Sequence, residues 1–180
     1  DECYLEFGRE VIPTSILNYT GGDNTNILAV HSLSKRSNLA GYRAAFVVGD
    51  PQLIAQILEV RKHAGMMVPL PIQKAMIAAL SDSVHVTEQR ARYNARKASL
   101  IPALVAAGFS IQHSDAGLYL WATRNEDCWK SVAWLASLGV IATPGIFYGE
   151  RGAQFIRIAM TATDDQINEA AQRIIAAVKE

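Results

Sequence analysis

The chain has 180 residues, half of them hydrophobic, which is enough to build a substantial core and argues against a disordered segment. Seventeen basic residues balance seventeen acidic ones, so no long-range field would attract nucleic acid or an anionic membrane. The 2 cysteines are too few for a disulfide framework, and no apolar run is long enough to cross a bilayer. These observations predict a cytoplasmic protein whose partners are small molecules and protein.

The first third of the chain predicts two strands and a helix. Residues 27–30 have the unbroken apolar character of a buried parallel strand, and residues 41–49 predict a second buried strand. Asp50 can cap a helix that starts at Pro51 and that we expect to end near residue 63. The chain opens at Asp1 without an initiator methionine, so we expect this terminus to have been cut from a longer chain.

The middle of the chain predicts two more helices. One is predicted over residues 72–80 and a longer one over residues 84–107. Pro102 lies inside the longer helix and is expected to kink or restart it. Its solvent-facing positions are expected to include Arg90, Arg92, Arg96 and Lys97.

Beyond residue 108 the pattern changes to a smaller α+β unit. It predicts strands at residues 109–113, 118–122, 140–142 and 155–160, and helices at residues 128–138 and 164–178. Thr163 begins a sequence suited to capping the last helix. We therefore place the domain boundary within the long helix. Residues 1–90 would form the end of a large α/β domain, and residues 91–180 a small α+β domain.

A lysine, two hydroxyl groups and an arginine follow the first predicted strand, at the end where ligands bind in open α/β sheets. Ser32, Ser34 and Arg43 supply donors suited to a phosphate group, and the guanidinium of Arg43 can bind two phosphate oxygens at once. Lys35 could form a Schiff base with an aldehyde cofactor. The spacing of the lysine and the arginine alone favours two solvated loop residues.

The complete segment is more specific than this spacing. Residues 32–35 read Ser-Leu-Ser-Lys and residues 38–43 read Asn-Leu-Ala-Gly-Tyr-Arg, which resembles the lysine signature of class I and II aminotransferases of fold type I. The resemblance implies an α/β chain with the end of the large doubly wound domain and the small C-terminal domain, and pyridoxal 5'-phosphate as cofactor. It also implies that Lys35 forms the Schiff base and carries a proton, and that Ser32, Ser34 and Arg43 bind the cofactor phosphate.

Other segments carry the same resemblance. Asp1-Glu2-Cys3-Tyr4 resembles the family's Asp-Glu-x-Tyr strand end, which implies that Asp1 pairs with the pyridine nitrogen and Tyr4 with the ring hydroxyl. An anion there keeps the nitrogen protonated, so that the ring can act as an electron sink. Residues 155–159 resemble the strand whose arginine, here Arg157, holds the substrate carboxylate. Residues 143–149 resemble the family's Pro-Gly-x-x-Phe-Gly turn at the mouth of the active site.

The remaining residues of chemical interest favour structural roles. Tyr119 and Trp121 lie on a predicted strand and are expected in the core. The four histidines, His31, His63, His85 and His113, show no metal-ligand spacing and are expected to be structural or exposed. No metal site is predicted.

Residues 31–50 and 61–69 most resemble the actinobacterial type of N-succinyldiaminopimelate aminotransferase. That resemblance implies transfer of an amino group between glutamate and a succinylated keto acid, N-succinyl-2-amino-6-oxopimelate, on the route to diaminopimelate and lysine. It also implies a homodimer. Residues 61–67 are a candidate for the dimer interface or for contact with the distal end of the substrate.

Two other functions remain open at this stage. The chain could belong to another fold-type-I enzyme, such as a carbon–sulfur lyase or a decarboxylase, because Asp1, Lys35 and Arg157 would serve there too. It could also be a non-catalytic, aminotransferase-like effector domain of a transcription regulator. Complete aminotransferases have a comparable length of chain before Asp1, so we expect the isolated chain to be marginally stable, aggregation-prone and inactive or nearly so.

Overall fold

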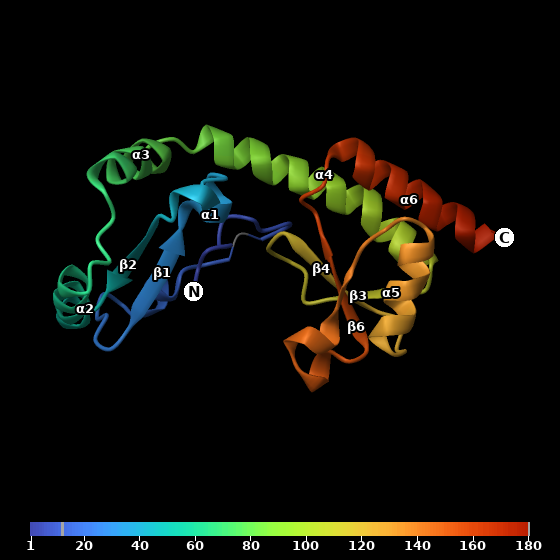
Figure 1. Cartoon of the computed structure of the whole chain (residues 1–180), viewed down its shortest axis with the longest axis horizontal. Helices are drawn as coiled ribbons and strands as arrows, with labels where there is room; N and C mark the ends of the chain where they lie inside the picture. The colour runs from blue at the N-terminus through green and yellow to red at the C-terminus, as the bar shows by residue number, and fades with distance from the viewer. Residues whose placement is uncertain (12, 180) are drawn as a thin grey trace. The chain divides into compact units, whose positions relative to one another are not determined.

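The computed structural model describes residues 1–11 and 13–179, and its α/β chain divides into two compact units. The N-terminal unit covers Asp1–Glu88 and the C-terminal unit covers Gln89–Glu180. Figure 1 follows the chain through both, and each unit is described on its own. Among the described residues, no helix has both the length and the apolar character needed to cross a membrane.

The sheet of the N-terminal unit is a pair of strands, β1 (Leu28–Ser32) and β2 (Ala45–Gly49). They run antiparallel, with Val30 opposite Val47, so the prediction of parallel character is wrong for this pair. The connection explains the direction. It consists of the single helical turn α1 (Leu33–Arg36) and the 3₁₀ turn η2 (Ala40–Tyr42), too short to carry the chain back along the strand as a parallel crossover requires.

Helix α2 (Pro51–His63) begins where the sequence predicted. The Asp50 carboxylate accepts the backbone N–H of Gln52 at 2.7 Å and that of Leu53 at 3.4 Å, which confirms it as the cap. The N–H of Asn26 donates to the same carboxylate at 2.8 Å. This bond is the largest influence that lowers the pKa of Asp50, so the charged cap also ties the loop before β1 to α2.

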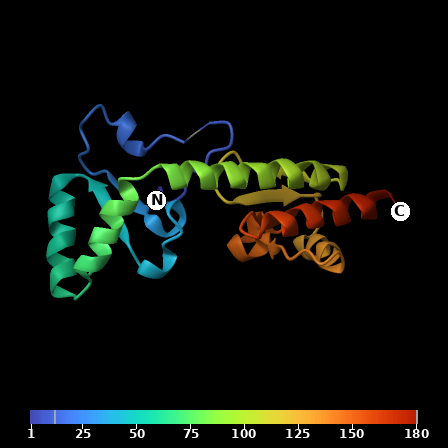
Figure 2. The same ribbon diagram turned by 90° about the horizontal axis from the view of Figure 1, so that it is seen from above.

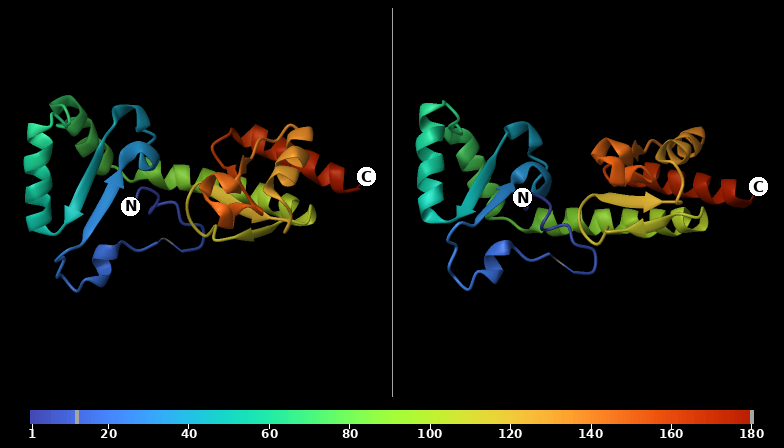
Figure 3. Two further views of the ribbon diagram at one scale, coloured as in Figure 1. Left: turned by 60° about the horizontal axis from the view of Figure 1, so that its bottom comes forward. Right: turned by 90° about the horizontal axis from the view of Figure 1, so that it is seen from below.

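Helices α2 and α3 (Leu70–Leu80) leave their apolar side chains open, and neither helix has a buried residue. Figure 3 shows both helices beside the β1–β2 ribbon. Their large exposed hydrophobic residues, with those of the loop between them, are Leu58, Val60, Met66, Met67, Leu70, Ile77 and Leu80. Such a surface is typical of an element that packs against further protein.

Helix α4 (Val84–Ala106) passes through Pro102 as one element, so the predicted restart is wrong. Proline removes the hydrogen bond to the carbonyl four residues earlier, here that of Ala98, and Ala98 is exposed, so water can satisfy that carbonyl. Lys97 is a second correction. It is 1% exposed, and its Nζ donates to the carbonyl of Gly117 at 2.8 Å.

The C-terminal unit holds a four-stranded antiparallel sheet in the order β3-β4-β6-β5. Its strands are β3 (Ser110–Gln112), β4 (Tyr119–Thr123), β5 (Thr143–Pro144) and β6 (Phe155–Ala159). The strand predicted at residues 140–142 is wrong, because pairing begins only at Thr143. The N–H of Val140 instead donates to the carbonyl of Leu135 at 2.9 Å and closes the end of α5 (Cys128–Ser137).

One face of this sheet forms the core of the unit. Leu120, Ala122, Ile156 and Ile158 alternate along β4 and β6 and are all at most 3% exposed. Figure 2 shows α4 and α6 (Asp164–Lys179) running alongside each other in this unit.

The predicted cap of α6 is confirmed: Thr163 Oγ1 accepts the N–H of Gln166, and the Gln166 side chain accepts the N–H of Thr163 at 3.1 Å.

Tryptophan fluorescence can test this account of the core. The three tryptophans, Trp121, Trp129 and Trp134, all lie in the C-terminal unit and report its unfolding. Leu120→Ala should lower the free energy of unfolding by about 2–5 kcal/mol, because the removed side chain is fully buried. Ile141→Ala is the matched control, since Ile141 is 92% exposed, and should change it by less than about 0.5 kcal/mol. Equal effects in urea titrations would contradict the assignment of the core face.

Candidate active site

The N-terminal segment lies against β1, the strand that leads to Lys35. The backbone N–H of Glu2 donates to the carbonyl of Val30 at 2.8 Å. Asp1 is exposed and its carboxylate accepts the N–H of Cys3 at 3.0 Å, while Tyr4 is half-buried. Asp1 and Tyr4, which were predicted to bind the cofactor ring, therefore lie in sequence on either side of Glu2, whose backbone N–H bonds the strand that leads to Lys35.

The side chain of Glu2 anchors this segment. Its carboxylate accepts the N–H of Ile16 at 2.8 Å and the hydroxyl of Ser15 at 3.1 Å, and it lies 3.2 Å from Nε2 of His31. Burial by itself raises the pKa of Glu2. The two hydrogen bonds and the charge of His31 together lower it by more than burial raises it, so the net pKa lies below its ordinary value. His31 in turn stacks on Phe46 with ring centroids 5.0 Å apart.

The lysine lies on the single helical turn α1. Ser32 caps this turn by accepting the N–H of Ser34 at 3.0 Å, and the two hydroxyl oxygens are 2.8 Å apart. Lys35 is half-buried and, among the described residues, forms no hydrogen bond or ion pair through its amine. Leu33 is 0% exposed and fixes the turn to the body of the unit.

Arg43 completes the set of phosphate donors expected from the sequence. It adopts a left-handed backbone conformation with φ of +52° at the end of η2, immediately before the chain enters β2. Its exposed guanidinium donates one hydrogen bond, to the carbonyl of Ala40 at 2.9 Å, and its other donors are open among the described residues. The segment from the end of β1 to the start of β2 thus carries two neighbouring hydroxyls, a lysine amine and an arginine guanidinium. This set of groups fits an anionic aldehyde cofactor.

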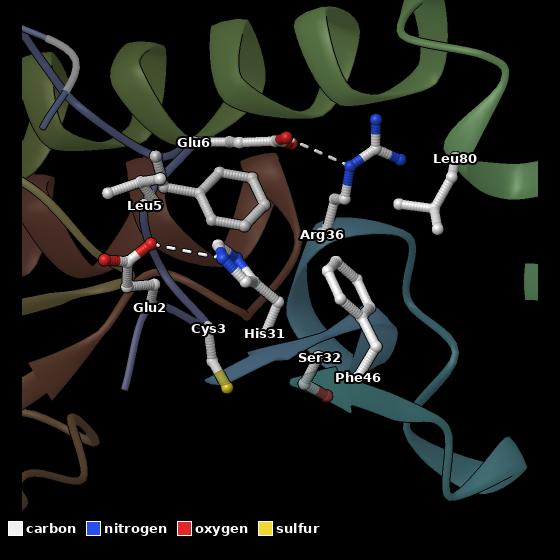
Figure 4. A pocket seen from close by; sticks show the side chains of 10 residues that line it. Glu2, Cys3, Leu5, Glu6, His31, Ser32, Arg36, Phe46 and Leu80 are labelled. Carbon is white, nitrogen blue, oxygen red and sulfur yellow. Dashed lines mark hydrogen bonds and ion pairs between the residues drawn. The ribbon is translucent and has the colours of Figure 1, made fainter. Parts of the chain in front are cut away.

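A cavity of about 260 Å³ lies between the N-terminal segment and β1 (Figure 4). Its lining includes the ion pairs Glu2–His31 and Glu6–Arg36 together with the ring of Phe46. Ser32 borders the cavity, but Ser34, Lys35 and Arg43 do not. The cavity therefore adjoins the lysine turn without including it.

Sequence reasoning missed a brace on the lysine turn. Arg36 Nε bonds Glu6 at 3.0 Å, and its Nη1 donates to the carbonyl of Ala79 at 2.7 Å. His85 lies 2.9 Å from the Ser37 hydroxyl through Nε2 and 2.7 Å from Asp82 through Nδ1. With Nδ1–H donating to Asp82, Nε2 accepts from Ser37. Apart from the contact between His85 and Asp82, these bonds join residues 30 to 48 positions apart, so no local pattern could have predicted them.

Arg157 lies in the C-terminal unit, on the sheet face opposite the core. Trp121 of β4 lies directly opposite Arg157 on the neighbouring strand β6. The guanidinium carbon of Arg157 lies 4.2 Å from the ring centroid of Tyr119 and 5.2 Å from that of Tyr148. Tyr119 and Trp121 are half-buried on this face rather than in the core, which corrects the expectation from sequence. Among the described residues, no cluster of three or more His, Cys, Asp or Glu side chains is arranged to hold a metal ion.

The sequence pattern of the family "Aminotransferase class I and II" matches residues 1–174, and the chain belongs to this family. Enzymes of this family depend on pyridoxal phosphate. Two relatives are more than half identical to it over 97% of the chain: a probable aminotransferase of Mycobacterium tuberculosis (57%) and the 4-dedimethylamino-4-oxo-anhydrotetracycline transaminase OxyQ of Streptomyces rimosus (56%). An LL-diaminopimelate aminotransferase of Natranaerobius thermophilus is 32% identical, also over 97% of the chain.

The fold agrees with these relatives. An aminotransferase from Neisseria meningitidis superimposes with a TM-score of 0.90 at 30% identity, covering 99% of this chain and 48% of that one. The chain thus has a partial aminotransferase fold of type I. It spans about half the length of the curated relatives it matches, which is 42% of the M. tuberculosis protein, 49% of OxyQ and 46% of the LL-diaminopimelate enzyme.

The brace can be tested through the pKa of Asp82. The hydrogen bond from His85, followed by that from the N–H of Val84, holds this pKa below its ordinary value. His85→Ala should raise the pKa of Asp82, measured by carbon NMR of the carboxyl group. Asp23 is the control, because Thr25 lowers its pKa independently of His85. An unchanged Asp82 titration would contradict the contact.

The same contact predicts the direction of a pH effect on stability. Because folding lowers the pKa of Asp82, its stabilising contribution is present above the unfolded pKa and is lost as the pH falls through the folded pKa. The His85→Ala variant should therefore lose less stability on acidification than the wild type. Circular dichroism in urea at neutral and acidic pH would measure this difference.

Proposed function

We propose that the protein to which this chain belongs is a pyridoxal-phosphate-dependent transaminase that moves an amino group between glutamate and a keto acid. The observation that carries the proposal is that Ser32, Ser34, Lys35 and Arg43 all lie on the short segment that runs from the end of β1 to the start of β2. The family membership and the relatives named as aminotransferases support it. The carbon–sulfur lyase, decarboxylase and regulator alternatives gain no support from these relatives.

The resemblance to the family's conserved segments proposes a role for each of these residues in the N-terminal unit. Ser32, Ser34 and Arg43 would bind the cofactor phosphate, and Asp1 and Tyr4 would bind its ring nitrogen and ring hydroxyl. When bound, pyridoxal phosphate withdraws electrons from the bonds at the substrate Cα. Lys35 would attach the cofactor covalently and afterwards accept and return the Cα proton. The absence of any hydrogen bond or ion pair on its amine among the described residues suits both tasks.

Arg157 would orient the substrate. Its guanidinium carries two parallel donors that match a carboxylate, and no carboxylate among the described residues pairs with it. A substrate carboxylate held in this way has one fixed orientation, which sets the direction of the Cα–H bond.

A narrower proposal concerns the keto acid. We propose N-succinyl-2-amino-6-oxopimelate, which would place the enzyme in diaminopimelate and lysine biosynthesis. The segment at residues 61–67, which is the end of α2 and the start of the loop after it, is a candidate for contact with the distal end of this substrate or for a homodimer interface. Met66 and Met67 are half exposed there, and the guanidinium of Arg61 bonds the carbonyl of Met66. A cytoplasmic homodimer remains part of the proposal.

Borohydride trapping tests the role of Lys35. The full-length protein, mixed with pyridoxal phosphate and reduced, should carry the label on Lys35 alone, located by peptide mass. Lys35→Ala should abolish the label and lower transamination by at least about 10³-fold, since the nucleophile and the proton carrier are lost together. Lys130→Ala is the matched control, because Lys130 is exposed on α5 and lies outside the segments proposed for the site. Labelling that persists in Lys35→Ala would exclude the assignment.

A comparison of amino donors tests the narrower proposal. With 2-oxoglutarate as acceptor, kcat/KM should be at least about tenfold higher for N-succinyl-LL-diaminopimelate than for LL-diaminopimelate, a difference of about 1.4 kcal/mol. A preference for LL-diaminopimelate, or activity with neither compound, would exclude the succinylated substrate. Pyruvate release from cystathionine without an amino acceptor would instead indicate a lyase.

A further inference from the structure

We propose that Tyr119 and Tyr148 are positioning residues that hold the Arg157 guanidinium through their ring faces, so that its edge stays available to a substrate carboxylate. The inference rests on the proposed function and adds two residues to it. Arg157 is a charged side chain on β6, an inner strand of the sheet β3-β4-β6-β5.

Arg157 lacks the usual partners of a half-buried arginine. Its Nε is buried and forms no hydrogen bond, and no carboxylate among the described residues forms an ion pair with it. A buried, unpaired donor on a charged group is costly. Two aromatic rings stand in place of an anion, with centroids 4.2 Å and 5.2 Å from the guanidinium carbon, both within the range of a cation–π contact.

The sheet register sets the position of the first ring. Tyr119 and Trp121 alternate along β4 and lie on the same face as Arg157, because Trp121 is directly opposite Arg157 and Tyr119 is opposite Ala159. Tyr119 is therefore the diagonal neighbour of the arginine, within reach of an aromatic side chain. Trp121 itself stacks on Phe155, with centroids 5.2 Å apart, so the aromatic neighbours on this face are also fixed.

The turn η3 (Gly145–Tyr148) sets the position of the second ring. Gly145 and Gly152 approach so closely that a Cβ on Gly145 would lie 2.3 Å from the carbonyl oxygen of Gly152. Only glycine fits at this contact, which fixes the turn that carries Tyr148. The Tyr148 ring then meets Trp121 edge-on, with centroids 5.8 Å apart. In the resembled Pro-Gly-x-x-Phe-Gly turn this residue is phenylalanine, which retains the ring.

This arrangement has a chemical consequence. An aromatic ring contacts the face of a guanidinium, whereas hydrogen bonds to a carboxylate are formed in its plane. The two tyrosines can therefore restrict the orientation of Arg157 without using the donors that a substrate needs. A carboxylate inside the protein would occupy those donors. The rings should lower KM for the carboxylate-bearing substrate and leave the chemical step itself largely unchanged.

The test uses the full-length protein with glutamate and 2-oxoglutarate. Tyr148→Leu and Tyr119→Leu should each raise KM for glutamate about tenfold while kcat changes less than about threefold, as expected for loss of one cation–π contact. Tyr148→Phe and Tyr119→Phe keep the ring and should stay within about threefold of the wild-type KM. Phe147→Leu is the matched control, because this neighbour on η3 packs on Trp129 instead of Arg157.

The outcomes separate the two proposals. Tyr148 is 54% exposed, so its replacement should not impair folding. If Tyr119→Leu fails to fold, the KM of the Tyr148→Leu variant alone tests the positioning role. An unchanged KM in Tyr148→Leu, or an equal rise in Phe147→Leu, would overturn the positioning role while the transaminase assignment stands. Glutamate binding can be measured by intrinsic fluorescence. If the wild-type protein neither transaminates nor binds glutamate, the proposed function is overturned and this inference with it.

Discussion

The candidate cofactor site depends on the backbone contact between the N-terminal segment and β1. One hydrogen bond from Glu2 to Val30 places the segment beside the strand, and the carboxylate of Glu2 ties it to His31. The antiparallel pairing of β1 with β2 then reverses the chain within a short connection that holds Lys35 and Arg43. This contact and the Glu6–Arg36 ion pair hold the segment that begins at Asp1 beside the strand and the turn that carry Lys35.

Local signals predicted the elements that local interactions form. Asp50 before Pro51 and Thr163 before Gln166 mark helix starts because each cap is completed within a few residues. The errors arose where a residue forms a contact that its own sequence pattern does not indicate. Residues 140–142 have a strand-like composition, but Val140 is used to close α5, and Lys97 is buried because Gly117 provides a carbonyl for it.

The chemical residues could be proposed from sequence because each lies on a short segment that resembles a segment of the family: residues 1–4, 32–43 and 155–159. The contacts that hold the lysine turn in place could not be predicted from sequence. Ser37 meets His85 and Arg36 meets Ala79 only after the chain folds, and neither pair has a local signature. The contact of the aromatic rings with Arg157 was also not predicted. Tyr119 was expected in the core, and its position on the same sheet face as Arg157 follows from the sheet register. The open apolar faces of α2 and α3 agree with a chain that spans about half of its relatives.

A crystal structure of the full-length protein grown with pyridoxal phosphate would test the central claim most directly. The account predicts continuous electron density between Nζ of Lys35 and the cofactor, with the phosphate bonded by Ser32, Ser34 and Arg43. A cofactor joined to a different lysine, or a phosphate bound away from the β1–β2 connection, would contradict it.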